Sequence, residues 1–362
     1  MTNASVEFSS SLVAPAGALL SAEVSAADNK ITAVTLNGNF AVEPAEAREV
    51  LTSALKATPL NEYTELVQAR LDTALEEYEQ QTGNSVQLEG FTTRDLAQVV
   101  RRAISQAVNF EDLDWEILHT DVMPSVLNVA LEEVLLEQVN TGQRGPTLRF
   151  WEWEDCATVI GSFQSYTNEV YPEGVEKHNV QVVRRISGGG TMFMDGGKCI
   201  TYSLYVPEKL VAGLSHVDSY EFLDRWVVNA LNDLGVKCWY IPINDITASE
   251  GKLAGAAQKR RGRSVLHHTT MSYEMNTEKM LDVLRTGKPK ILDKGLPSAN
   301  KRVDSISRQT TATRAEVIDA LQEAFITRYG GNAVELDSQT LNAAKELVDA
   351  KYTSPTWTHR VP

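Results

Sequence analysis

The chain has 362 residues, 43% of them hydrophobic, and a net charge of −14. This length supports two domains with separate cores, and the acidic balance argues against a nucleic-acid-binding protein, since such proteins are more often basic. The sequence shows neither a run of about 20 apolar residues for a membrane helix nor a basic stretch ahead of an apolar one. Three widely spaced cysteines, Cys156, Cys199 and Cys238, suit a reducing compartment, so we expect a cytoplasmic protein without a membrane or nucleic-acid partner.

Residues 1–110 are expected to form a small α+β domain. Alternating apolar residues predict two strands within residues 18–40, with turns at Asp28–Asn29 and Asn37–Gly38. Apolar residues at three- and four-residue spacing predict helices over residues 47–55, 62–81 and 92–108. The acidic stretch 110–116 is interpreted as a linker to a second domain.

Residues 111–362 are expected to form a larger α+β domain around a mixed sheet. A helix is predicted over residues 124–139, with Pro124 near its first turn, and another over residues 220–236. Helices are also expected after residue 313. Strands are predicted within residues 147–165, 180–187, 199–207 and 251–276.

The densest motif is "RRISGGGTMFMDGG", Arg184 to Gly197. Glycines after a strand allow backbone N–H groups to approach phosphate or carboxylate oxygens, but three glycines also suit a tight turn between strands. The phosphate-binding loop motif fails because Met192 and Cys199 stand where Gly and Ser or Thr are needed. From the residues alone, an anion site and a plain turn both remain open.

A second group of residues is Asn244, Asp245 and Lys252, within "INDITASEGKLAGAAQ". Aspartate can bind Mg²⁺ and lysine can neutralise phosphate oxygens, so the group fits a phosphate site. A lysine between small residues is also common on protein surfaces. We expect Lys252 on a hairpin strand, with its ammonium directed to one face.

These segments, together with "HHTTM" and "KRVDSIS", resemble the lipoate–protein ligase family in order and spacing over about residues 124–308. The resemblance implies the α+β fold of class II aminoacyl-tRNA-synthetase-like biotin/lipoate ligases for residues 111–362. Residues 1–110 resemble the accessory domain that lipoate ligases carry at the C-terminus or as a separate polypeptide. Here that domain would be fused at the N-terminus.

The family activates lipoate with ATP and Mg²⁺ to lipoyl-AMP and transfers the lipoyl group to a lysine. The resemblance implies as acceptors the lipoyl domains of 2-oxoacid dehydrogenase E2 subunits and the glycine cleavage H protein. It implies that Lys252 is catalytic and that Asp245 is a metal ligand. Lipoate or lipoyl-AMP would contact Arg185, Ser187, Gly188, Gly189, Gly190, Asp195, Asn244, Asp245 and Gly255, with Arg184 supporting the strand. Trp151 and the strand before Gly161 are candidates for the lipoyl-tail slot.

One departure from the family pattern is Met194, where a histidine usually precedes the aspartate. The main alternative function is an octanoyl or lipoyl transferase of the same fold, which uses a cysteine and no ATP. Cys238, fourteen residues before Lys252, would then carry the acyl group. Cys238 could equally be a buried residue of a strand. Two further functions of the whole chain also remain open, a biotin-type ligase and a non-catalytic scaffold. "KRRGR", residues 259–263, is either a solvated loop or a site that steers an acidic acceptor.

Overall fold

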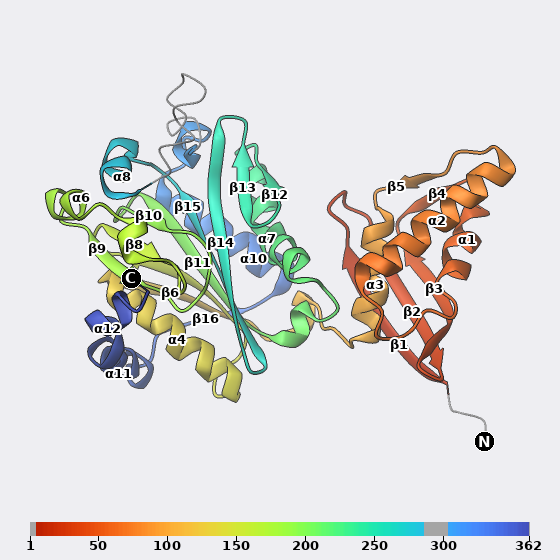
Figure 1. Ribbon diagram of the computed structural model, residues 1–362, viewed down its shortest axis with the longest axis horizontal. Coiled ribbons are helices and arrows are strands. Elements are labelled where there is room, and N and C mark those ends of the chain that lie inside the picture. Colours follow the sequence, from red (N-terminus) through yellow and green to blue (C-terminus); the bar gives the residue numbers. More distant parts are fainter. Residues whose placement is uncertain (1–4, 286–302, 362) are drawn as a thin grey trace. The chain divides into compact units, whose positions relative to one another are not determined.

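We describe residues 5–285 and 303–361 of a computed structural model of the chain (Figure 1). The chain divides into two compact units, residues 1–112 with 209–219, and residues 113–208 with 220–362. Lys301 and Arg302, which open the "KRVDSIS" motif, lie outside the described residues. Within the described ranges, no helix combines the length and apolarity that a membrane span requires.

The first unit is built on a three-stranded antiparallel sheet in the order β1-β2-β3. Asp28 and Asn29 have positive φ and join β2 to β3 as a two-residue turn, which confirms the predicted turn. The sequence did not predict β1, because three consecutive serines interrupt its apolar residues. The elements are β1 (Val6–Val13), β2 (Leu19–Ala27), β3 (Lys30–Gly38), β4 (Ala41–Glu43), β5 (Gln87–Glu89), α1 (Ala47–Ala54), α2 (Thr64–Thr82) and α3 (Thr93–Ile104).

A later segment, residues 209–219, also belongs to the first unit. The buried Arg102 donates hydrogen bonds to the carbonyl oxygens of Leu210 at 2.8 Å and Val108 at 2.7 Å. Arg94 and Asp218 form an ion pair at 2.5 Å. The first unit is therefore discontinuous in sequence, whereas a single domain boundary after residue 110 was expected from the sequence.

The second unit contains an eight-stranded mixed sheet in the order β12-β13-β14-β15-β11-β7-β6-β16. β6 runs parallel to both β7 and β16, and the other neighbours are antiparallel. The interpretation of residues 110–116 as a linker is wrong for the end of that stretch, because Trp115 is buried and Glu116 begins β6. The strands are β6 (Glu116–Met123), β7 (Thr147–Trp153), β11 (Cys199–Pro207), β12 (Trp239–Ile241), β13 (Asp245–Ala248), β14 (Gly251–Arg261), β15 (Ser264–Ser272) and β16 (Asn332–Val334).

The two faces of this sheet pack on different helices. On β15, His267 contacts Asp224 of α7 and the next residue, His268, contacts Glu132 of α4. Because successive strand residues point to opposite faces, α4 and α7 define the two faces, which we call the α4 face and the α7 face. α7 (His216–Asp233) begins in the first unit and continues in the second from residue 220. The other helices of the second unit are α4 (Ser125–Thr141), α5 (Tyr166–Glu169), α6 (Pro172–Lys177), α8 (Thr277–Val283), α10 (Arg314–Tyr329), α11 (Ser338–Leu347) and α12 (Pro355–Thr358).

A small sheet, in the order β10-β8-β9, carries the glycine motif. β8 (Ala157–Ile160) runs parallel to β9 (Gln181–Arg184) and antiparallel to β10 (Met192–Met194). The tight-turn interpretation is therefore wrong, because residues 185–191 leave one neighbour of β8 and return as the other. We call residues 185–191 the glycine loop; it crosses the carboxyl end of β8.

Arg184, the last residue of β9, is fully buried and binds carbonyl groups from two segments. Its guanidinium donates to the carbonyls of Gly161 at 2.9 Å, Gln164 at 2.7 Å and Thr358 at 2.7 Å. It therefore holds α12 and the segment after β8 to the end of β9. This contact pattern is that of a structural support.

We expect Arg184→Leu to lower the stability of the second unit by about 3 kcal/mol or more, because several buried carbonyls lose their donor. All six tryptophans of the chain lie between residues 115 and 357 of that unit. Tryptophan fluorescence during urea unfolding therefore reports this unit selectively. The control is the exposed Arg328, whose change to leucine should shift stability by no more than about 0.5 kcal/mol. Equal midpoints for the two variants would contradict the support role.

Candidate functional site

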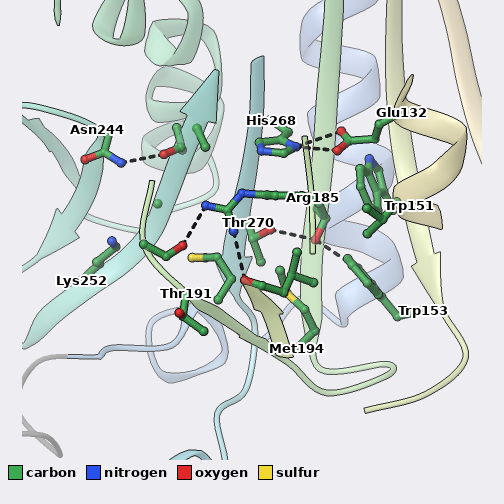
Figure 2. A pocket seen from close by; sticks show the side chains of 18 residues that line it. Glu132, Trp151, Trp153, Arg185, Thr191, Met194, Asn244, Lys252, His268 and Thr270 are labelled. Atoms are coloured by element: carbon green, nitrogen blue, oxygen red, sulfur yellow. Dashed lines mark hydrogen bonds and ion pairs between the residues drawn. The ribbon is translucent and has the colours of Figure 1, made fainter. Parts of the chain in front are cut away.

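Lys252 stands where two cavities of the second unit adjoin. Both are lined by Thr191, Met192, Lys252, Gly255 and Thr270. The aromatic cavity continues along Trp151, Trp153, Val159, Met194 and His268 (Figure 2). The methionine cavity continues along Phe193, Cys199, Met271, Met275, Met280 and Leu284. Their volumes, open mouths included, are about 580 and 830 Å³, within the range of small-molecule sites.

The β13–β14 hairpin positions Lys252 as the sequence predicted. Asp245 pairs with Gly255 across the hairpin, and the Lys252 ammonium lies 2.6 Å from Asp245 Oδ1. A Cβ on Gly255 would lie 2.6 Å from Lys252 Nζ. An alanine at position 255 would therefore displace the end of the Lys252 side chain from its place over the strand. Both charged groups are partly exposed, so an anionic ligand can approach the ammonium.

Asn244 lies beside this pair and also lines the aromatic cavity. Its amide nitrogen donates to the carbonyl oxygen of Ala256 at 2.6 Å, while the Ala256 amide donates to the Asn244 carbonyl at 2.9 Å. Asn244 thereby fixes the start of β13 against β14, which holds Asp245 opposite Gly255.

The Arg185 guanidinium is directed into its own loop (Figure 2). It donates to the carbonyl oxygens of Gly188 at 2.6 Å, Gly190 at 2.7 Å and Val159 at 3.0 Å. Burial lowers the pKa of Arg185 to about 10, an effect that the negative charge of Glu132 opposes. Most N–H donors of Arg185 are already bound to oxygen atoms of the protein. Its direct effect is therefore to shape the loop at the cavity wall, and little of the guanidinium is left free to bind lipoate.

The other expected site residues divide between the cavity walls and their surroundings. Gly190 lines the aromatic cavity, and Gly188 and Gly189 belong to the same loop. Ser187 is fully buried behind the wall. Asp195 belongs to neither cavity wall among the described residues; its carboxylate lies 3.3 Å from the Lys279 ammonium and 3.6 Å from that of Lys198.

Met194 extends the apolar wall of the aromatic cavity. It is 3% exposed and packs in one cluster with Trp151, Trp153 and Val159. The two indole rings stack at 5.1 Å between centroids. At this position the chain therefore has a thioether against aromatic and aliphatic groups, where a histidine would bring a polar ring to the cavity wall.

The structure does not bring Cys238 to the Lys252 cavities. This thiol is 6% exposed, packs beneath α7 with Sγ 3.9 Å from the Val228 carbonyl oxygen, and lines neither cavity within the described chain. Burial raises its pKa to about 12, so the reactive thiolate is disfavoured. Cys199 does line the methionine cavity, and burial raises its pKa to about 12 as well.

Sequence reasoning missed two ionisable residues of the aromatic cavity, Glu132 and His268. His268 belongs to the "HHTTM" motif, but no role was assigned to it. Glu132 occupies a core-facing position of α4, where Asn128, Leu131 and Leu135 are also buried. A charged residue in the apolar phase of an amphipathic helix was the available signal.

The "KRRGR" segment lies at the other end of β14 from the reacting lysine. Seven residues of extended strand separate Lys252 from Lys259, which corresponds to about 23 Å. Arg261 forms ion pairs with Glu133 at 3.1 Å and Glu137 at 3.5 Å on α4. The proximity to Lys252 in sequence is therefore not proximity in space.

Solved structures with a similar fold are lipoate protein ligases. The bi-partite ligase of Thermoplasma acidophilum matches with a TM-score of 0.60 and 23% identity, over 69% of this chain and 98% of that one. A lipoate-protein ligase A structure bound with ATP matches with a TM-score of 0.59 and 23% identity, over 68% and 99%. The expected α+β lipoate ligase fold is confirmed.

The family model for the lipoyl protein ligase A/B catalytic domain matches residues 124–326, and the chain belongs to this family. A protein named "Probable lipoate-protein ligase A" from Mycoplasma pneumoniae is 28% identical over 64% of this chain and 67% of its own length. Octanoyltransferase LipM of Geobacillus kaustophilus is 25% identical over 67% and 97%. The chain is thus an enzyme of the lipoate ligase and octanoyltransferase family.

We expect Gly255→Ala to lower the kcat/KM of this enzyme by about 100-fold or more, because the added Cβ displaces the Lys252 ammonium. The control is Gly145→Ala, where a Cβ would meet ordinary contacts at 3.5 Å and 3.6 Å. Acyl transfer to a lysine acceptor is the measurement, with thermal unfolding to confirm the fold of both variants. Full activity in Gly255→Ala would show that the lysine position tolerates the change.

Proposed function

We propose that the chain is an ATP-dependent lipoate–protein ligase, which forms lipoyl-AMP and transfers the lipoyl group to a lysine of an acceptor domain. The observation that carries this proposal is the position of Lys252 at the junction of the two cavities. Activation brings a carboxylate to an α-phosphate, so two anionic groups must meet. An ammonium fixed between the sites stabilises the charge that builds up in that transition state.

The lining of the two cavities supports a division of labour between them. The stacked Trp151 and Trp153 with Met194 suit the apolar lipoyl tail, whose carboxylate would then lie toward Lys252. The nucleotide would occupy the adjoining methionine cavity, with its α-phosphate near the same ammonium. In the second step, Lys252 would polarise the acyl carbonyl for attack by the acceptor lysine.

ATP is expected to bring Mg²⁺ to the site. Among the described residues there is no group of three His, Cys, Asp or Glu side chains that could hold a metal ion by themselves. One carboxylate together with phosphate oxygens is nevertheless a usual Mg²⁺ environment, and Asp245 beside Lys252 could supply it. The ion would neutralise phosphate charge there.

We expect Asp245→Asn to raise the Mg²⁺ concentration needed for half-maximal lipoate activation by about tenfold, because the carboxylate is lost while the side-chain shape is kept. Titration of Mg²⁺ at fixed ATP and lipoate measures this. The control is Asp195→Asn, whose carboxylate lies outside the cavities and should leave the Mg²⁺ dependence unchanged. An unchanged curve in Asp245→Asn would remove this residue as a metal ligand.

The acceptors would be lipoyl domains of 2-oxoacid dehydrogenase E2 subunits and the glycine cleavage H protein. One structurally similar ligase was studied with its E2 lipoyl domain, which supports the first class of acceptor. The first unit would act as the accessory domain of the ligase. Its position at the N-terminus would make the chain self-sufficient for activation.

A second candidate function is ATP-independent octanoyl transfer. It is favoured by the relatives named octanoyltransferase LipM, which are 24 to 26% identical and are covered over 84 to 99% of their length. The buried position of Cys238 speaks against that residue as the acyl carrier.

Lipoate-dependent exchange of pyrophosphate into ATP separates the two functions, because only a ligase forms an acyl-adenylate. We expect exchange by the full chain, a loss of about 100-fold or more in Lys252→Ala, and an unchanged rate in Cys238→Ser. If the full chain shows no exchange but transfers octanoate from octanoyl-acyl carrier protein without ATP, the ligase proposal fails.

A further inference from the structure

A continuous series of buried hydrogen bonds runs along the wall of the aromatic cavity on the α4 face. Arg185 Nε lies 2.9 Å from Ser187 Oγ, which lies 2.8 Å from His268 Nε2. His268 Nδ1 lies 2.8 Å from Glu132 Oε2 and 2.9 Å from Oε1. Ser203 binds the same carboxylate at 2.8 Å. Figure 2 shows Glu132 and His268 side by side at the cavity, with Arg185 next to His268.

The direction of each hydrogen bond follows from the groups involved. With the ring singly protonated, the proton is on Nδ1, because this atom faces two carboxylate oxygens, and Nε2 is the acceptor. Ser187 Oγ accepts from the Arg185 guanidinium, which leaves its own hydrogen to donate to His268 Nε2. The carboxylate of Glu132 therefore sets, through one imidazole, the orientation of the hydroxyl that receives Arg185.

The end of this series is the glycine loop. With Nε bound to Ser187, the guanidinium plane is fixed, and its Nη2 group reaches the carbonyls of Gly188 and Gly190. A Cβ at Gly189 would lie 3.0 Å from Arg185 Nη2, so the loop and the guanidinium fit closely. The carbonyls are held on Arg185, and the loop has one defined conformation at the cavity wall.

We propose that Glu132 and His268 are positioning residues, which fix the glycine loop through Ser187 and Arg185 without touching substrate in the reacting position. The proposal deepens the proposed function, since this loop forms the wall beside which lipoate is activated. Ser187 is fully buried and is not itself an acyl carrier. Loss of the series would misplace the loop, and misplacement of about 1 Å costs about 100-fold in rate.

The chain offers a matched control in the neighbouring residue. His267 is fully buried, against 9% exposure for His268, and binds the buried carboxylate of Asp224 at 2.6 Å, but on the α7 face. His267→Gln and His268→Gln remove the same ring from the same strand and leave a buried carboxylate short of one partner. Only the second change breaks the path to the glycine loop.

The test compares His268→Gln, Ser187→Ala and His267→Gln with the full unchanged chain. Hydrogen–deuterium exchange of residues 187–190 without ligand should become at least about tenfold faster in the first two variants and stay unchanged in His267→Gln. In pyrophosphate exchange, the first two should lose about 100-fold in kcat with KM for lipoate within about threefold. Ser187→Ala removes a single oxygen, so it keeps the test usable if His268→Gln does not fold.

Unchanged loop exchange in both Ser187→Ala and His268→Gln would overturn the proposal, as would equal effects of His267→Gln and His268→Gln at equal folded fraction. Hydrogen exchange needs no turnover. If the unchanged chain lacks pyrophosphate exchange, the ligase proposal fails. Hydrogen exchange of the loop still tests the positioning role of Glu132 and His268, and the rate to compare is then that of octanoyl transfer.

Discussion

The site of the second unit depends on one buried cation, the guanidinium of Arg185. A loop of glycines has little conformational preference of its own, so its shape must be imposed from outside. Here three backbone carbonyls and one hydroxyl converge on Arg185, and the loop follows from their geometry. The carboxylate of Glu132, on the opposite side of His268, compensates the buried charge. Loop, histidine and helix α4 therefore form one electrostatic unit.

The sequence allowed the parts of the site that are local to be predicted. Lys252 and Gly255 lie in a segment that was predicted as a strand, and Asp245 was grouped with them by its nearness in sequence and by the family resemblance; β13, which pairs Asp245 with Gly255, was not predicted. The series through Glu132, His268 and Ser187 joins residues up to 136 positions apart, and no pattern in a single sequence specifies such a contact. For the same reason the carbonyl partners of Arg185 were missed, since they become visible only once β8 and β9 are paired, while its expected contact with substrate stays a prediction.

The fold shows the same division between local and non-local information. Helices with clear periodicity and hairpins with short turns were predicted, whereas β1 and β6 were missed. β6 has polar residues at its centre, and its parallel partners, β7 and β16, both follow it in the sequence. That residues 209–219 belong to the first unit could not be predicted either, because this depends on the buried Arg102, which is far away in sequence.

The strand β15 has a residue order with a consequence for folding. Its central residues come in like pairs, Val265–Leu266, His267–His268 and Thr269–Thr270, so each kind of side chain occurs on both faces. A slip of one residue would exchange the faces while leaving their chemistry almost unchanged, so the strand's own pattern specifies its register only weakly. The two-residue connection at Gly262 and Arg263, tied to Asn140 by the Arg263 amide, must then set the alignment. The end of the basic segment 259–263, which first suggested a docking site, thus sets the register of β15. That register determines which of the two histidines faces the glycine loop.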